Sequence, residues 1–184
     1  MPEPQLQMER ASLDGLPEVT VPAGYRIRSY RPGDGAAWCR VVNEAIGGDY
    51  SEQLFQAEMA KAFAFEPADL LFAEGGAEAV GTAWAVRAQN APEKVGYVHM
   101  VAVASKHRGC GLGRALVLSV LHRFREMGLH SAMLRTDDFR LAAIRVYLSL
   151  GFCPKLAHES HRIRWREAYR KLGVNERDWR DQST

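Results

Sequence analysis

The sequence feature that most constrains the fold is a glycine-rich turn, RGCGLG at residues 108–113, between an apolar segment and an amphipathic one. The apolar segment spans residues 98–103, and helical periodicity follows the turn from near Arg114. Glycines permit backbone angles that aim successive N–H groups at one point, and the first N–H groups of a helix lack partners within it. Because the helix dipole also favours negative charge there, we expect a strand, a turn and a helix N-terminus that bind a phosphate-bearing ligand.

Two well-known phosphate motifs do not match this turn. Its glycines are spaced G-x-G-x-G, Arg114 occupies the last position of the dinucleotide fingerprint, and no acidic residue about 20 positions on ends a clear second strand. No Gly-Lys-Ser/Thr follows, so the P-loop is excluded. A tight turn without any ligand is the alternative for these residues alone.

A second segment, residues 142–152, has the pattern of a helix that stops at a glycine. Ile144, Tyr147 and Leu148 share one face at helical spacing, and Gly151 is typical of a helix C-terminus. Taken from spacing alone, Tyr147 is a core aromatic residue.

The two segments together resemble the GNAT superfamily of N-acetyltransferases, which use acetyl-coenzyme A (acetyl-CoA). The turn at residues 108–113 matches the R/Q-x-x-G-x-G/A motif of the family. The A-x-x-x-Y-x-x-x-G-F motif is matched by Ala143, Tyr147, Gly151 and Phe152. The resemblance covers residues 25–152 and implies an α/β (α+β) fold: one domain with a mixed, mostly antiparallel sheet, splayed parallel central strands and flanking helices.

The periodicity of the chain independently predicts one α/β domain around a mixed sheet. Expected strands are residues 6–13, 25–30, 69–73, 79–88, 95–103 and 130–135; expected helices are residues 35–46, 51–61, 112–127, 142–150 and 160–172. Asp34 and Ser51 are expected helix N-caps. We expect an N-terminal extension at residues 1–23, a GNAT domain at 24–172 and a C-terminal tail at 173–184.

The resemblance also implies which residues bind the cofactor. The expected cofactor-binding residues are Val101, Ala102, Val103, Arg108, Gly109, Cys110, Gly111, Leu112, Gly113, Arg114 and Arg140. The backbone N–H of Val101 would bind the acetyl carbonyl, and Val103 would hold the pantetheine arm. Arg140 departs from the family, since many members carry an asparagine there.

Catalytic candidates follow from the chemistry of acetyl transfer. Tyr147 is the candidate general acid, because a phenol can protonate a departing thiolate. His99 is the candidate base, expected on the same strand face as Val101 by alternation. Glu159 and His158, which follow the second motif, are the next candidates. A structural role in the strand is the alternative for His99.

Charge and cysteine content bear on partners and compartment. Residues 1–92 carry a net charge of −6 and residues 93–184 carry +8. The basic half suits an anionic cofactor and the acidic half a cationic amine, although solvated surface charge explains both equally well. Three cysteines without metal spacing, no signal-peptide pattern and no membrane-length apolar run favour a cytoplasmic protein without a metal.

These observations predict an N-acetyltransferase that moves an acetyl group from acetyl-CoA to a primary amine by direct attack in a ternary complex. Expected partners are an amine-bearing small molecule or peptide, and neither nucleic acid nor membrane. The oligomeric state is open, a homodimer included. The alternative is a non-catalytic acyl-CoA-binding sensor that keeps the fold without the chemistry.

Overall fold

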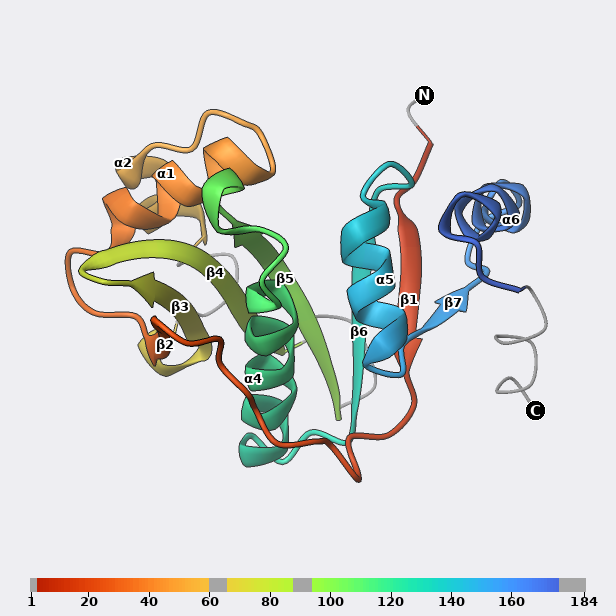
Figure 1. Cartoon of the computed structure of the whole chain (residues 1–184), viewed down its shortest axis with the longest axis horizontal. Coiled ribbons are helices and arrows are strands. Elements are labelled where there is room, and N and C mark those ends of the chain that lie inside the picture. The colour runs from red at the N-terminus through yellow and green to blue at the C-terminus, as the bar shows by residue number, and fades with distance from the viewer. Residues whose placement is uncertain (1–2, 60–65, 88–93, 176–184) are drawn as a thin grey trace.

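The computed structural model describes residues 3–59, 66–87 and 94–175. These residues form one seven-stranded sheet in the order β2-β3-β4-β5-β6-β1-β7 (Figure 1). The strands are β1 (Leu6–Arg10), β2 (Tyr25–Ser29), β3 (Leu70–Gly75), β4 (Glu78–Arg87), β5 (Val95–Val103), β6 (Ser131–Thr136) and β7 (Cys153–Lys155). All neighbours are antiparallel except β5 and β6, which confirms the expected mixed, mostly antiparallel sheet.

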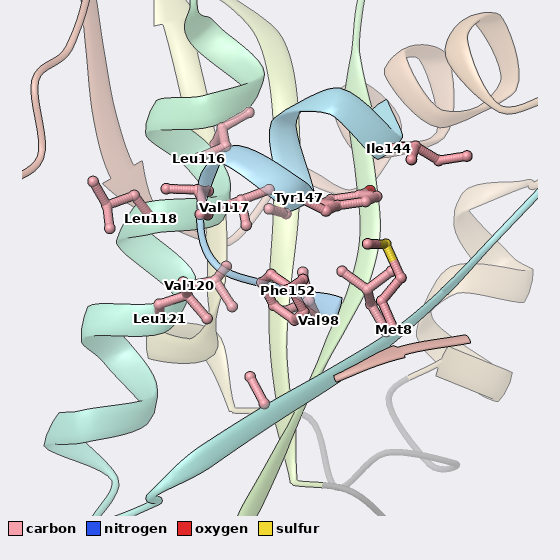
Figure 2. Close-up of a cluster of buried hydrophobic side chains, with 14 of the residues drawn as sticks. Met8, Val98, Leu116, Val117, Leu118, Val120, Leu121, Ile144, Tyr147 and Phe152 are labelled. Carbon is pink, nitrogen blue, oxygen red and sulfur yellow. The ribbon is translucent and has the colours of Figure 1, made fainter. Parts of the chain in front are cut away.

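The helices cover the two faces of the sheet unequally. They are α1 (Gly35–Ala45), α2 (Glu52–Leu54), α4 (Leu112–Glu126), α5 (Leu141–Ser149) and α6 (His161–Leu172), with the short helices η1 (Phe55–Met59), η2 (Pro67–Asp69) and η3 (Ser105–His107). One apolar cluster joins α4, α5 and α6 to one face, hereafter the α4 face. Figure 2 shows the part of this cluster in which side chains of α4 and α5 meet those of the sheet. A second cluster joins α1 to the other face, hereafter the α1 face. No helix in the described part of the chain is long and apolar enough to cross a membrane.

The N-terminal segment contributes a strand to the inside of the sheet. β1 lies between β6 and β7 and is antiparallel to both, and its Leu6 and Met8 are fully buried on the α4 face. The expected strand at residues 6–13 is therefore present but shorter. The expected helix at residues 51–61 forms α2 and the π-helical η1, and its last two residues lie outside the described range. Ser51 is an N-cap as expected, since its hydroxyl accepts a hydrogen bond from the Leu54 N–H at 3.1 Å.

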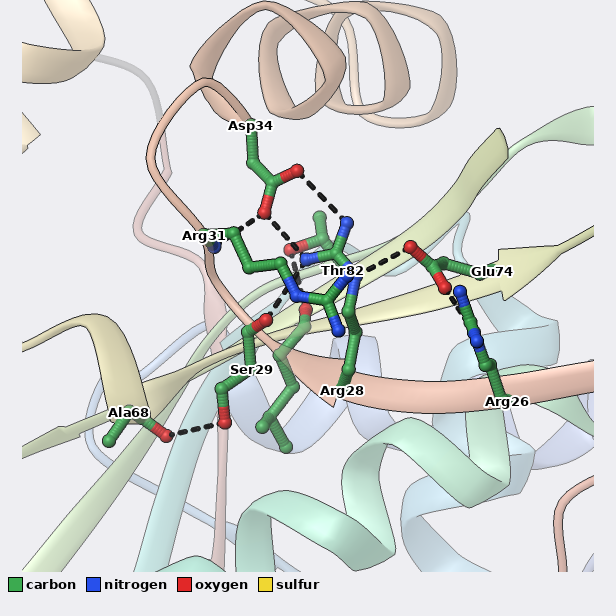
Figure 3. A network of polar contacts seen from close by, with 9 residues as sticks. Arg26, Arg28, Ser29, Arg31, Asp34, Ala68, Glu74 and Thr82 are labelled. Atoms are coloured by element: carbon green, nitrogen blue, oxygen red, sulfur yellow. Dashed lines mark hydrogen bonds and ion pairs between the residues drawn. The ribbon is translucent and has the colours of Figure 1, made fainter. Parts of the chain in front are cut away.

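A buried carboxylate connects the outer strands to α1. Glu74 on β3 is only 5% exposed and accepts hydrogen bonds from Arg26 and Arg28 of β2 (Figure 3). The hydrogen bond from Arg28 holds the pKa of Glu74 below its usual range. Arg28 also pairs with both carboxylate oxygens of Asp34, at 2.6 and 2.9 Å. Asp34 is the N-cap residue of α1 as expected, and its carbonyl accepts a hydrogen bond from the Trp38 N–H at 2.8 Å. Its carboxylate makes no capping bond to the helix, because it is bound by Arg28.

The two central parallel strands separate along their length. β5 pairs with β6 only as far as Val98 opposite Leu134, whereas β5 continues to Val103 beside β4. Figure 1 shows the two strands close together at one end and far apart at the other, where β5 leads toward α4. The last part of β5 thus has β4 on one edge and no pairing with β6 on the other.

β5 contains a bulge at the point where it leaves β6. His99 lies opposite Trp84 and Ala102 lies opposite Thr82, so β5 has one more residue than β4 between these two pairs. Met100, within the extra stretch, has a φ of +48°, which is unusual for a residue other than glycine. A bulge reverses the alternation of side chains beyond it, so residues on either side of Met100 do not follow a simple odd-even pattern.

Candidate active site

The glycine turn meets the geometric requirements of an anion site. Gly109 and Gly111 have φ values of +81° and +90°, which favour glycine, and a Cβ at either would meet no neighbouring atom within 4 Å. Gly111 is also the N-cap of α4, and no side chain caps that helix end. The first N–H groups of a 15-residue helix therefore face an open turn. This arrangement can bind a phosphate through the backbone.

Side chains around the turn fold back onto the protein. The Nε of Arg108 donates to the Val103 carbonyl at 2.9 Å, and the thiol of Cys110 donates to the His107 carbonyl at 3.2 Å. Glu44, from α1, accepts hydrogen bonds from the Ser105 N–H and hydroxyl, both at 2.7 Å. The backbone of the turn is thus held from the end of β5 and from α1. Glu44 was not predicted, because nothing local in the sequence indicates a contact across 61 residues.

The open edge of β5 adjoins this turn. Val101, Ala102 and Val103 occupy the part of β5 that has no pairing with β6. Gly113 in the first turn of α4 faces Val103, whose side chain lies 3.9 Å from the position of a Cβ on Gly113. The structure therefore brings the predicted strand residues and the predicted phosphate turn together.

Tyr147 projects from α5 into the cluster on the α4 face. It is 6% exposed, and its ring lies 6.0 Å from that of Phe152, edge to face (Figure 2). Burial raises the pKa of Tyr147 to about 12, with Arg140 opposing and Tyr97 adding to the shift. The hydroxyl is therefore protonated at neutral pH and can donate a proton or a hydrogen bond.

His99 does not lie where alternation predicts. Its ring faces the rings of Trp84 and Tyr97 at 6.2 and 5.4 Å, on the α1 face, whereas Val101 packs against the cluster on the α4 face. The expected shared face was wrong, because the bulge at Met100 intervenes. Burial also lowers the pKa of His99 to about 4, so the imidazole is neutral at pH 7.

Glu159 lies apart from the open edge of β5. It follows β7, which β6 and β1 separate from β5, and its side chain is exposed. With His158 and Arg162 it lines a shallow surface pocket beside the N-terminus of α6. The structure therefore does not bring Glu159 together with Val101.

The guanidinium of Arg140 donates hydrogen bonds to three groups of the protein. Its Nε donates to Asp137 Oδ2 at 2.9 Å, and its Nη1 and Nη2 donate to the carbonyls of Ala45 and Ile46 at 3.4 and 3.0 Å. The guanidinium also lies 5.1 Å from the ring centroid of Phe139. The side chain thus reaches the C-terminal end of α1.

Comparison with known families matches residues 37–152 to the family described as the acetyltransferase (GNAT) family. That span includes the open edge of β5, the glycine turn and Tyr147. It covers more than half of the chain.

Individual relatives agree with the family match. A mycothiol acetyltransferase of Thermomonospora curvata is 40% identical over 154 residues, covering 80% of this chain and 50% of the relative. Its counterpart in Thermobispora bispora is 37% identical, covering 79% and 52%. The chain thus spans about half the length of the curated relatives it matches. The structure of a GCN5-related N-acetyltransferase from Sphaerobacter thermophilus is similar, with a TM-score of 0.69, 25% identity, and coverage of 83% of this chain and 50% of that one.

Proposed function

The chain belongs to the acetyltransferase (GNAT) family, and from that premise we propose that it transfers an acetyl group from acetyl-CoA to a primary amine by direct attack in a ternary complex. The observation that carries the proposal is the uncapped N-terminus of α4 directly beyond the open edge of β5. A pyrophosphate and a thioester need these two features next to each other.

Binding of acetyl-CoA would use the backbone more than side chains. The N–H groups at residues 109–114 would hold the pyrophosphate, and the open edge at residues 101–103 would hold the pantetheine arm. An N–H group aimed at the acetyl oxygen stabilises the negative charge that develops when the amine attacks. The Val101 N–H is our candidate for that donor.

In the transfer step, the amine nitrogen forms a bond to the acetyl carbon and the carbon–sulfur bond breaks. The departing thiolate takes a proton, and we assign its donor to Tyr147. The hydroxyl stays protonated at neutral pH, so Tyr147 has a proton to share with the departing thiolate.

The amine must also lose a proton, and the arrangement argues against His99 as its acceptor. With a pKa of about 4, the imidazole is a weak base for an ammonium group. Glu159 is separated from β5 by two strands. We therefore propose that water carries the amine proton to solvent, so that the rate follows the fraction of free amine.

The name of the curated relatives suggests where to look for the acceptor. Both are mycothiol acetyltransferases, so an acceptor related to mycothiol belongs in the first panel of amines tested. The panel should also contain amino acids, amino sugars and a peptide with a free N-terminus.

The test is a thiol-release assay with acetyl-CoA and this amine panel, with product mass as confirmation. We expect one amine class to release coenzyme A well above the rate with buffer alone. The alternative function, an acyl-CoA sensor, predicts binding of acetyl-CoA without turnover on any amine.

A further inference from the structure

The side chain of Arg140 connects two parts of the chain on opposite sides of the gap between β5 and β6. Arg140 belongs to the turn between β6 and α5, whereas Ala45 and Ile46 end α1, which packs on β4 and β5. The hydrogen bonds from Arg140 to their carbonyls span more than 90 residues of sequence. The bridge therefore joins the two separated halves of the sheet.

The chemistry of both ends makes this a specific bridge. The last carbonyls of a helix lack partners within it, and α1 has no basic residue in its last turn. The guanidinium supplies both the hydrogen-bond donors and the positive charge that a helix C-terminus favours. Asp137 orients the guanidinium from behind through its Nε, so all three nitrogens are used.

The bridge crosses the end of the gap that the open edge of β5 faces, where the proposed thioester would lie. The segment that follows α1 is held against it, because Asn43 exchanges two hydrogen bonds of 2.9 Å with the backbone of Tyr50. We call the end of α1 and the segment that follows it, residues 43–50, the wall. Through Ala45 and Ile46, Arg140 thus sets the position of this wall relative to α5, which carries Tyr147.

We propose that Arg140 is a positioning residue that holds the end of α1 against the β6–α5 turn and thereby sets the affinity for the acceptor amine, not for coenzyme A. The proposal deepens the function proposed above and rests on it. Bridging two segments needs the planar fork of arginine, which lysine does not offer.

The first test compares Arg140→Gln with a matched control, Arg145→Gln. Arg145 also donates to a carbonyl at the end of a helix, that of Leu172 in α6 at 3.1 Å, away from the β5–β6 gap. With the amine that the wild type acetylates fastest, we expect Arg140→Gln and Arg140→Lys to raise the acceptor KM by about tenfold to a hundredfold. The dissociation constant of coenzyme A should stay within about twofold in these variants, and Arg145→Gln should leave both constants unchanged. A weaker affinity for coenzyme A with an unchanged acceptor KM would overturn the proposal.

The second test does not depend on turnover. Amide hydrogen exchange at Ile46 and Tyr50, whose N–H groups bond to Val42 and Asn43, reports the order of the wall. We expect faster exchange at both in Arg140→Gln and no change in Arg145→Gln. Equal exchange in Arg140→Gln and wild type would refute the bridge even if the protein is an active acetyltransferase. Faster exchange in a protein that acetylates no amine would instead leave the bridge in place and refute the proposed function.

Discussion

The carboxylate of Glu44 accepts two hydrogen bonds from Ser105, one from the backbone N–H and one from the hydroxyl, each 2.7 Å long. Ser105 begins η3, the short helix between β5 and the glycine turn. These hydrogen bonds lower the pKa of Glu44 and tie α1 to the segment that leads into the proposed phosphate site. Loop geometry in this protein thus depends on a side chain from another element.

The Glu44 contact leads to a first prediction. Replacing Glu44 with alanine removes both hydrogen bonds to Ser105, so the turn samples more conformations in the free protein. Binding of acetyl-CoA then costs more conformational entropy. We expect the dissociation constant of acetyl-CoA, measured by calorimetry, to rise by about threefold to tenfold. Glu78→Ala, an exposed glutamate at the start of β4, is the control and should not change it. Wild-type affinity in Glu44→Ala would show that the turn is rigid without this contact.

The glycine turn leads to a second prediction. Gly111→Ala forces a side chain into a left-handed conformation and shifts the first N–H groups of α4, so coenzyme A affinity should fall by at least about tenfold. Gly128, just beyond the other end of α4, is a matched control with a φ of +73° and no atom within 4 Å of its Cβ position. Like Gly111→Ala, Gly128→Ala should lower the free energy of unfolding by about 1–2 kcal/mol, but it should not change the affinity for coenzyme A. Equal losses of affinity in both variants would remove Gly111 from the site.

The position of Tyr147 leads to a third prediction. Tyr147→Phe keeps the ring in the cluster but removes the hydroxyl, so kcat should fall by about a hundredfold while coenzyme A affinity stays near that of the wild type. Tyr169→Phe removes a buried hydroxyl from α6 and serves as the control. Its kcat should equal that of the wild type. An unchanged kcat in Tyr147→Phe would exclude Tyr147 as the proton donor.

Burial of His99 leads to a fourth prediction, on stability against pH. Its pKa is about 4 in the folded chain and about 6.5 when unfolded, so the unfolded chain binds more protons between these values. The free energy of unfolding therefore rises with pH through this window and is lost as the pH falls from 6.5 toward 4, by about 3 kcal/mol in all.

Urea unfolding of wild type and His99→Gln at pH 4.5 and pH 7 measures this effect, with the exposed His130→Gln as control. His99→Gln should lose less stability than the wild type on acidification, and His130→Gln should lose the same amount. A kinetic measurement gives a second readout. Because the pKa of His99 is about 4 in the folded chain, kcat/KM should rise with pH without an inflection near pH 6.5. An equal acid loss in wild type and His99→Gln would mean that His99 is protonated in the folded chain.

Features that depend on neighbouring residues were predictable from the sequence. The strand, turn and helix around residues 108–113 follow from glycine geometry and apolar periodicity. Ser51 caps its helix through a hydrogen bond that spans only three residues. Tyr147 and Ile144 are buried together because helical spacing places them on one face.

Features that depend on distant partners were not predictable. The bulge at Met100 arises from the register between β4 and β5, which no local pattern encodes, and it moves His99 to the other face. Asp34 is the N-cap residue of α1 as the pattern predicts, but its carboxylate is bound by Arg28 and not by the helix. The partner of Arg140 lies 94 residues away, at the end of α1.

The most direct test of the central claim, that the turn and the open strand edge form an acetyl-CoA site, is a calorimetric titration of acetyl-CoA into the protein. ATP and NAD serve as controls, since both carry phosphates but lack the pantetheine thioester. We predict saturable binding of one acetyl-CoA, with much weaker binding of the controls. At a hundredfold excess over its dissociation constant, acetyl-CoA should stabilise the fold by about 2.7 kcal/mol and raise Tm by a few degrees. Binding of all three ligands with equal affinity, or of none, would contradict the claim.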